Sequence, residues 1–144
     1  MFEEIKRILV GIDGSYNSNR AFNRALKIAE KNGAELYVTR VVEDYSIVEE
    51  DGILQLVSYD EDPEVIEARD DLNSKFMLTR YPITDTLLRI GNPRIIIKKY
   101  LIPGLKIDLL VLGFTGKDIP DGKHLGSLTK YLTGQVKCRV LVVD

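Results

Sequence analysis

The feature that most restricts the fold is a regular alternation of short apolar runs with stretches of helical periodicity. A strand of a parallel sheet that is covered on both faces is largely apolar, and five short segments rich in apolar residues are predicted as strands. They span residues 8–12, 36–42, 83–90, 107–112 and 139–143. Between them, apolar residues at three- and four-residue spacing predict helices over 21–29, 62–80, 92–101 and 124–136. This order predicts an α/β fold in three layers, a doubly wound parallel sheet with right-handed crossovers.

Capping residues mark where several of these helices begin and end. Asn32-Gly33 closes the first, and Asp62-Pro63 provides an N-cap followed by proline in the first helical turn. Asn92-Pro93 opens the third helix in the same way, and Pro103-Gly104 is predicted to end it. Residues 43–61 have no clear period, so the sequence predicts no element there. We find no repeat or linker, and we expect residues 1–144 to form one domain.

Composition excludes several classes of protein. No apolar run approaches the roughly 20 residues that cross a bilayer, and the acidic N-terminus does not resemble a signal peptide. The single cysteine, Cys138, cannot form an intramolecular disulfide and is expected to be a buried structural thiol. One cysteine and one histidine, His124, cannot make a Cys/His zinc site. These features predict a cytoplasmic protein with no membrane partner.

Charge is nearly balanced overall but unevenly distributed. A net charge of -2 gives no general attraction to nucleic acid, which we do not expect as a partner. Residues 43–71 contain twelve acids and one base, whereas residues 72–144 contain twelve bases and five acids. The acidic stretch is interpreted as a solvated surface segment or, alternatively, as a face that binds a partner.

Glycines follow the fourth predicted strand at a distinctive spacing. Gly113 and Gly116 are three residues apart, and Gly126-Ser127 comes nine residues later, near the start of the last predicted helix. Glycine tolerates positive φ, so these residues allow a sharp turn that exposes backbone amides. Free amides and the positive end of a helix dipole suit phosphate oxygens. In open α/β sheets ligands bind beyond the carboxyl ends of the strands.

The pattern Gly-x2-Gly-x9-Gly-Ser resembles that of ATP-binding universal stress proteins. The resemblance covers nearly the whole chain and includes the segment 8–15, which ends in Asp13-Gly14-Ser15, as well as Gly91-Asn92-Pro93 and the strand 108–113. Gly11 departs from the family, since proline is frequent there. The resemblance implies a five-stranded sheet of order 3-2-1-4-5, which sets the first and fourth strands side by side.

The resemblance also implies a set of binding residues and partners. ATP or AMP would be the ligand, with Mg²⁺ or Mn²⁺ near the phosphates and Asp13 as the nearby carboxylate. Two copies would pair through the fifth strand as a homodimer. Val41 would meet the adenine through its backbone, and Gly126, Ser127 and Leu128 would hold the phosphate tail. The full set of implied contacts is Gly11, Asp13, Val41, Leu112, Gly113, Thr115, Gly116, Gly126, Ser127 and Leu128.

Other interpretations of these residues stay open at this point. Asp13 could instead cap the first helix, and His124 is interpreted as a surface residue rather than a catalytic base. An adenine-nucleotide hydrolase of the same fold is the alternative to a regulatory nucleotide-binding protein. An ATP-pyrophosphatase would need paired glycines after the first strand, and a phospho-receiver would need an aspartate ending the third strand. Both are missing, and we expect little or no ATP turnover.

Overall fold

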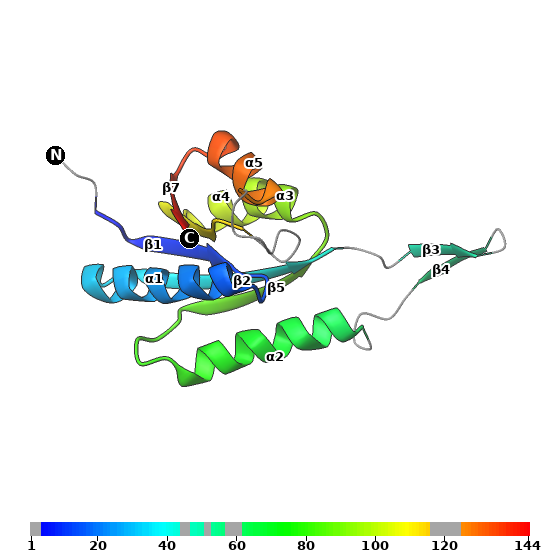
Figure 1. Ribbon diagram of the computed structural model, residues 1–144, viewed down its shortest axis with the longest axis horizontal. Helices are drawn as coiled ribbons and strands as arrows, with labels where there is room; N and C mark the ends of the chain where they lie inside the picture. Colours follow the sequence, from blue (N-terminus) through cyan, green and yellow to red (C-terminus); the bar gives the residue numbers. More distant parts are fainter. Residues whose placement is uncertain (1–3, 44–46, 51–52, 57–61, 116–124) are drawn as a thin grey trace.

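The main body of the molecule is a five-stranded parallel sheet. The computed structural model describes residues 4–43, 47–50, 53–56, 62–115 and 125–144, and for 47–56 the backbone only. The strands are β1 (Arg7–Gly11), β2 (Glu35–Val42), β5 (Asp85–Ile90), β6 (Leu109–Gly113) and β7 (Arg139–Val143). They lie in the order β5-β2-β1-β6-β7 (Figure 1). Counted along this sheet alone, the order is 3-2-1-4-5, as predicted.

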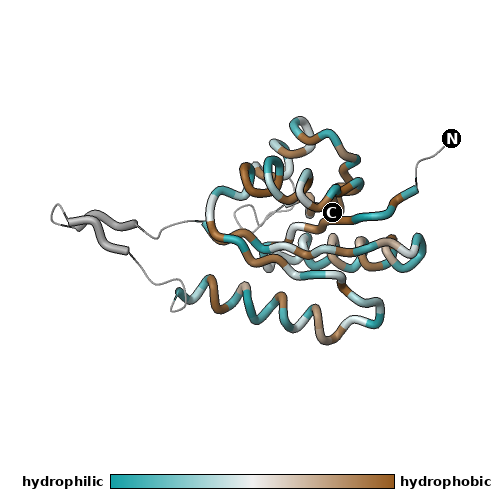
Figure 2. Tube along the Cα trace, turned by 180° about the vertical axis from the view of Figure 1, so that it is seen from behind, coloured by the Kyte–Doolittle hydropathy of each residue, from teal (hydrophilic) through white to brown (hydrophobic). Residues whose placement is uncertain are grey.

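Helices cover both faces of the sheet, which confirms the three-layer arrangement. One layer contains α1 (Tyr16–Asn32) and α2 (Pro63–Leu78). The other contains α3 (Pro93–Ile95), the π-helical segment η2 (Ile96–Leu101), α4 (Ile102–Leu105) and α5 (Ser127–Gln135) (Figure 1). Apolar and polar residues alternate along α1 and α2, as expected for helices that bury one side (Figure 2).

The strands supply core residues to both layers in alternation. Ile8 and Val10 of β1 are fully buried in a cluster that includes the inner face of α1. Leu9, between them, is fully buried in the opposite cluster, together with Leu132 of α5. Successive side chains of a strand point to opposite faces, so a strand between two helical layers has apolar residues on both faces, and the buried Thr39 and Arg40 of β2 are exceptions with polar partners. Burial on both faces is the reason that the short apolar runs predict the strands correctly.

The predicted caps of the first two helices are present. Asp62 accepts a hydrogen bond from the backbone N of Glu64 at 2.8 Å, with Pro63 in the first turn. Gly33 ends α1 in the left-handed conformation, at φ 64°. The start of α1 lies earlier than the periodicity alone indicates, because Ser15 is its N-cap and accepts from the backbone N of Ser18 at 3.2 Å.

The third predicted helix does not end before Pro103. It continues through η2 into α4, which contains both Pro103 and Gly104 and ends at Lys106 in the left-handed conformation, at φ 54°. Proline cannot donate a backbone hydrogen bond, and its ring clashes with the carbonyl four residues earlier. The wider π-helical turns of η2 immediately precede Pro103, and such turns relieve that clash. The prediction of a helix end was therefore wrong.

The acidic segment contains a hairpin that the sequence does not predict. Strands β3 (Ile47–Glu50) and β4 (Ile53–Leu56) pair with each other in antiparallel fashion and form a separate two-stranded sheet. These two strands are not part of the main sheet, so the apolar pattern by which the main strands are predicted does not apply to them.

Cys138 lies at the start of β7 and is half-buried against the α5 side of the core. Burial raises the pKa of its thiol, so less of it is ionised at neutral pH than in an exposed cysteine. This agrees with a structural thiol. No helix among the described residues is long and apolar enough to cross a membrane.

Candidate functional site

A cavity of about 780 Å³ opens at the carboxyl ends of β1, β2 and β6. Its wall contains nine of the ten residues that the sequence comparison with a nucleotide-binding family implies: Gly11, Asp13, Val41, Leu112, Gly113, Thr115, Gly126, Ser127 and Leu128. The tenth, Gly116, lies outside the described residues, as does His124. Parallel pairing of β1 with β6, with Val10 opposite Val111, brings the turn at Asp13 beside Gly113.

The turn after β1 forms one wall of the cavity. Asp13 Oδ1 accepts from the backbone N of Ser15 at 2.9 Å, and Ser18 Oγ accepts from the backbone N of Asp13 at 3.2 Å. Gly14 has a φ of 83°, which glycine adopts without strain. Ser15, rather than Asp13, caps α1. Asp13 thus orders the turn before the helix and stays at the cavity wall.

Gly113, at the end of β6, is glycine for a different reason from the positive φ that was inferred from the sequence. Positive φ occurs at Gly14, Gly33 and Gly91 among the described glycines, and not at Gly113. A Cβ atom at position 113 would lie 2.9 Å from the backbone carbon of Asn17 and 3.0 Å from the backbone N of Ser18. The residue is glycine because β6 passes directly against the backbone of α1, so the explanation by positive φ was wrong here.

Two threonine hydroxyl groups form hydrogen bonds that connect the end of β6 to a helix on each face of the sheet. Thr115 Oγ1 accepts from Asn17 Nδ2 of α1 at 2.6 Å. On the other side, Thr129 Oγ1 of α5 donates to the carbonyl oxygen of Gly113 at 2.8 Å. Both threonines are buried. The end of β6, which lines the cavity, is therefore connected by hydrogen bonds to both α1 and α5.

The N-terminus of α5 faces the cavity, since Ser127 and Leu128 are part of its lining. Gly126 is the N-cap, with φ -59° and ψ 148°, and makes no side-chain cap. The first backbone N–H groups of a helix have no acceptor inside the helix and carry the positive end of its dipole. The start of α5 can therefore accept an anionic group, and an exposed Ser127 hydroxyl adds one more hydrogen-bonding group.

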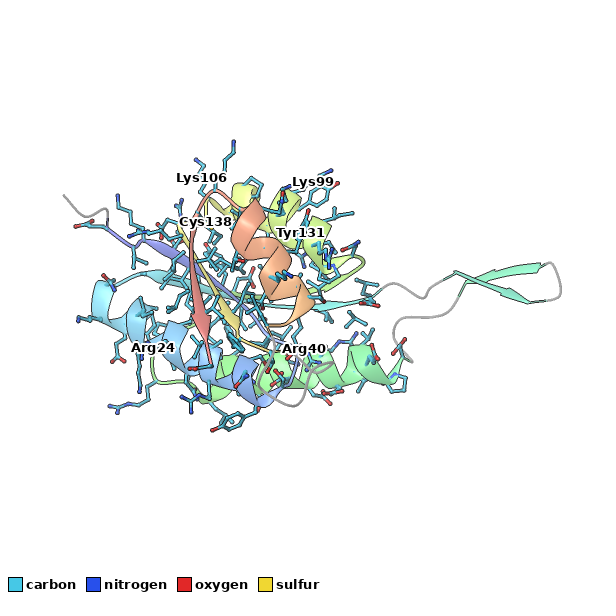
Figure 3. All side chains as sticks on the ribbon, turned by 45° about the horizontal axis from the view of Figure 1, so that its top comes forward. Arg24, Arg40, Lys99, Lys106, Tyr131 and Cys138 are labelled. Carbon is cyan, nitrogen blue, oxygen red and sulfur yellow. The ribbon has the colours of Figure 1, made fainter. Side chains whose placement is uncertain are left out.

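The charges on the cavity wall include an arginine that sequence reasoning missed. Arg40 of β2 is buried, and its guanidinium lies 3.1 Å from Asp71 and 3.7 Å from Glu67, both on α2 (Figure 3). Its second terminal nitrogen lies 3.5 Å from the carbonyl oxygen of Asp13. Its charge is thus balanced by α2. The sequence feature that could have identified Arg40 is its charge within a predicted strand of mostly apolar residues.

A second group of missed residues comes from the start of α3. Gly91, Asn92, Pro93 and Arg94 follow β5 and line the cavity. Asn92 caps α3 by accepting from the backbone N of Arg94 at 3.0 Å. The position of these residues after a strand end was the signal. Within the part of the chain that the structure describes, no group of three or more His, Cys, Asp or Glu side chains could hold a metal ion by itself.

Comparison with known proteins gives a consistent match. The model of the universal stress protein family matches residues 4–144. A protein of Staphylococcus aureus (strain USA300) that carries the family name is 32% identical over 143 residues, covering 96% of this chain and 83% of that protein. The structure of universal stress protein UspA from Lactobacillus plantarum has a TM-score of 0.83 at 28% identity and covers 99% of this chain and 100% of that one. A universal stress protein in complex with cAMP has a TM-score of 0.64 at 25% identity, with 99% of both chains covered.

Proposed function

Since this chain belongs to the universal stress protein family, we propose that it binds an adenine nucleotide, ATP or AMP, in the cavity at the carboxyl edge of its sheet. The observation that carries the proposal is the convergence of the Asp13 turn, the end of β6 and the uncapped start of α5 on one cavity. A structural neighbour is a complex with cAMP, which supports a nucleotide as the ligand class.

The cavity offers a different kind of contact for each part of such a ligand. The backbone of Val41 would pair with the adenine, and Leu112 and Gly11 would border the base. Thr115 and Gly113 would lie beside the ribose. The amides that begin α5, at Ser127 and Leu128, would hold the phosphates. Asp13 is the carboxylate that would share a Mg²⁺ or Mn²⁺ ion with phosphate oxygens, since magnesium usually binds through few carboxylates and substrate phosphates.

We assign a regulatory role rather than hydrolysis to this site. Phosphoryl transfer depends on positioned cations and on a group that orients the attacking water. The guanidinium of Arg40 is engaged by Asp71 and Glu67 of α2 and is not a free cation for a transferred phosphoryl group. No specific observation favours the hydrolase alternative, so binding is the function that the geometry supports best.

The bound ligand can be identified directly. Freshly purified protein is denatured, and the released small molecules are identified and counted by mass spectrometry before and after dialysis against ATP with magnesium. We expect about one adenine nucleotide per chain, and after dialysis we expect it to be intact ATP. Recovery of ADP would favour the hydrolase. Failure to retain any adenine nucleotide from millimolar solution would rule out the proposed function.

We further propose that two copies pair through β7. This strand lies at the edge of the sheet and bonds only to β6 among the described strands. Its residues Val140 to Val143 are apolar and half-exposed, and an open edge of this kind favours pairing with another strand. Sedimentation equilibrium at tens of micromolar should give the mass of a dimer, and substitution of Leu141 by lysine should shift it toward the monomer. A monomer for the unsubstituted protein at these concentrations contradicts the proposal.

A further inference from the structure

We propose that Arg94 is the side chain that makes this site select a phosphorylated nucleotide over the corresponding nucleoside. The inference rests on the proposed function and adds a residue to it. Arg94 is the second residue of α3 and belongs to no sequence motif that implies the site. It lines the cavity from α3, which lies in the helical layer on the other face of the sheet from α1, the helix that follows the Asp13 turn.

The Arg94 guanidinium lies against an aromatic ring. Its Cζ lies 4.8 Å from the centre of the Tyr131 ring. Tyr131 is on α5, one helical turn beyond Ser127, and Figure 3 shows it on the side of α5 that faces α3 and η2. Residues four apart lie on the same face of a helix. The guanidinium is therefore held along the same face of α5 whose first turn would receive the phosphates.

Arg94 is also the cavity arginine whose charge is not already engaged. Arg40 is held by Asp71 and Glu67. No carboxylate within the described ranges forms an ion pair with Arg94, and its guanidinium contact is the ring of Tyr131. A guanidinium resting on an aromatic face still presents N–H groups at its edge, in a geometry that matches two phosphate oxygens.

The cavity wall also carries acidic residues, so the charge of Arg94 matters for the choice of ligand. Asp13, Glu43 and Glu64 place three carboxylates around the cavity. A nucleotide adds two to four negative charges at neutral pH, whereas a nucleoside adds none. Opposite charges attract at short range, so a cation on the wall, beside any metal ion that Asp13 shares with the phosphates, favours the phosphorylated ligand over the nucleoside. Arg94 supplies that cation at the α5 side of the cavity.

The test measures the affinities of ATP, AMP and adenosine for the full chain and for Arg94→Gln. A charge-assisted pair of hydrogen bonds corresponds to about 10- to 100-fold in affinity. We expect Arg94→Gln to weaken ATP and AMP by that factor and to change adenosine by less than about twofold. Tyr131→Leu should weaken ATP less, and it should have no further effect once Arg94 is replaced, because the ring acts only by positioning the guanidinium.

Lys98 provides the matched control. Its Nζ lies 5.8 Å from the centre of the same ring and 3.2 Å from Gln135 Oε1, and it does not line the cavity. Lys98→Gln should leave all three affinities unchanged, and if it weakens ATP as much as Arg94→Gln does, the effect is one of general charge and the inference fails. Equal weakening of ATP and adenosine by Arg94→Gln also overturns it. If the unsubstituted protein binds none of the three ligands, the proposed function itself fails.

Discussion

Saturating ATP should raise the melting temperature of the unsubstituted protein by about 5 to 10 °C and leave that of Gly126→Val unchanged. A ligand that binds only the folded state stabilises it by RT ln(1 + [L]/Kd), which is about 2.7 kcal/mol at a hundredfold excess over Kd. Each kcal/mol corresponds to roughly 2 to 4 °C for a domain near this size. The valine should remove the shift because its side chain would stand where the phosphates approach the first turn of α5.

The backbone at Gly126 makes this experiment interpretable. Its φ of -59° and ψ of 148° suit any residue, so a side chain there needs no strained backbone. Valine is a poor N-cap, however, and can cost about 1 kcal/mol without ligand. The unliganded melting temperature is therefore measured for each variant, with Gly126→Ala as the smaller substitution. Ser127→Ala should retain part of the shift, since it removes one hydrogen bond of about 1.5 to 3 kcal/mol to a charged acceptor. A full shift in Gly126→Val would mean that phosphates do not bind at the start of α5.

The sequence predicts the fold well because a strand that is buried on both faces is recognisable as a short run of mostly apolar residues. A central strand has apolar residues on both faces, as Ile8, Leu9 and Val10 of β1 show, and each covering helix is apolar on the side that faces the sheet. The wrong predictions concern a segment outside the main sheet and a residue type, proline, that occurs both at helix ends and within helices. The hairpin β3–β4 lies outside the main sheet, and Pro103 continues a helix because the π-helical turns before it accommodate its ring.

The sequence predicted the turns that line the candidate site but not the two arginines that line it. Turns with glycine or a capping residue can be recognised in sequence, and those at Asp13 and Gly126 do line the cavity. Arg40 and Arg94 were not singled out from the sequence, because a charged residue within a strand and a residue just after a strand end do not by themselves show that either side chain reaches the cavity. Arg40 is notable for its burial and its pairing with Asp71, which no local pattern encodes. The order of the strands therefore determines which of these side chains reach the cavity.

Gly113 and Gly126 are glycine for two different physical reasons, and substitutions at the two positions should have different effects. Gly113→Ala should destabilise the protein by about 1 to 3 kcal/mol whether or not nucleotide is present, which lowers the melting temperature by roughly 2 to 12 °C. Its Cβ would stand 2.9 to 3.1 Å from backbone atoms of Asn17 and Ser18, so a helix backbone, rather than a flexible side chain, would have to move. ATP should still raise the melting temperature of this variant, in contrast to Gly126→Val.

Gly134→Ala is the matched control for this prediction, measured by thermal and denaturant unfolding. Position 134 lies in α5, and apart from the neighbouring backbone of the helix itself no atom lies within 4 Å of the added Cβ. Alanine is the better helix former, so this variant should be more stable by up to about 1 kcal/mol. Opposite signs for the two Gly→Ala changes are expected, because only position 113 meets another backbone. If Gly113→Ala is as stable as the unsubstituted protein and loses only the ATP shift, then Gly113 is a ligand-approach residue like Gly126, and the packing of β6 against α1 does not require glycine.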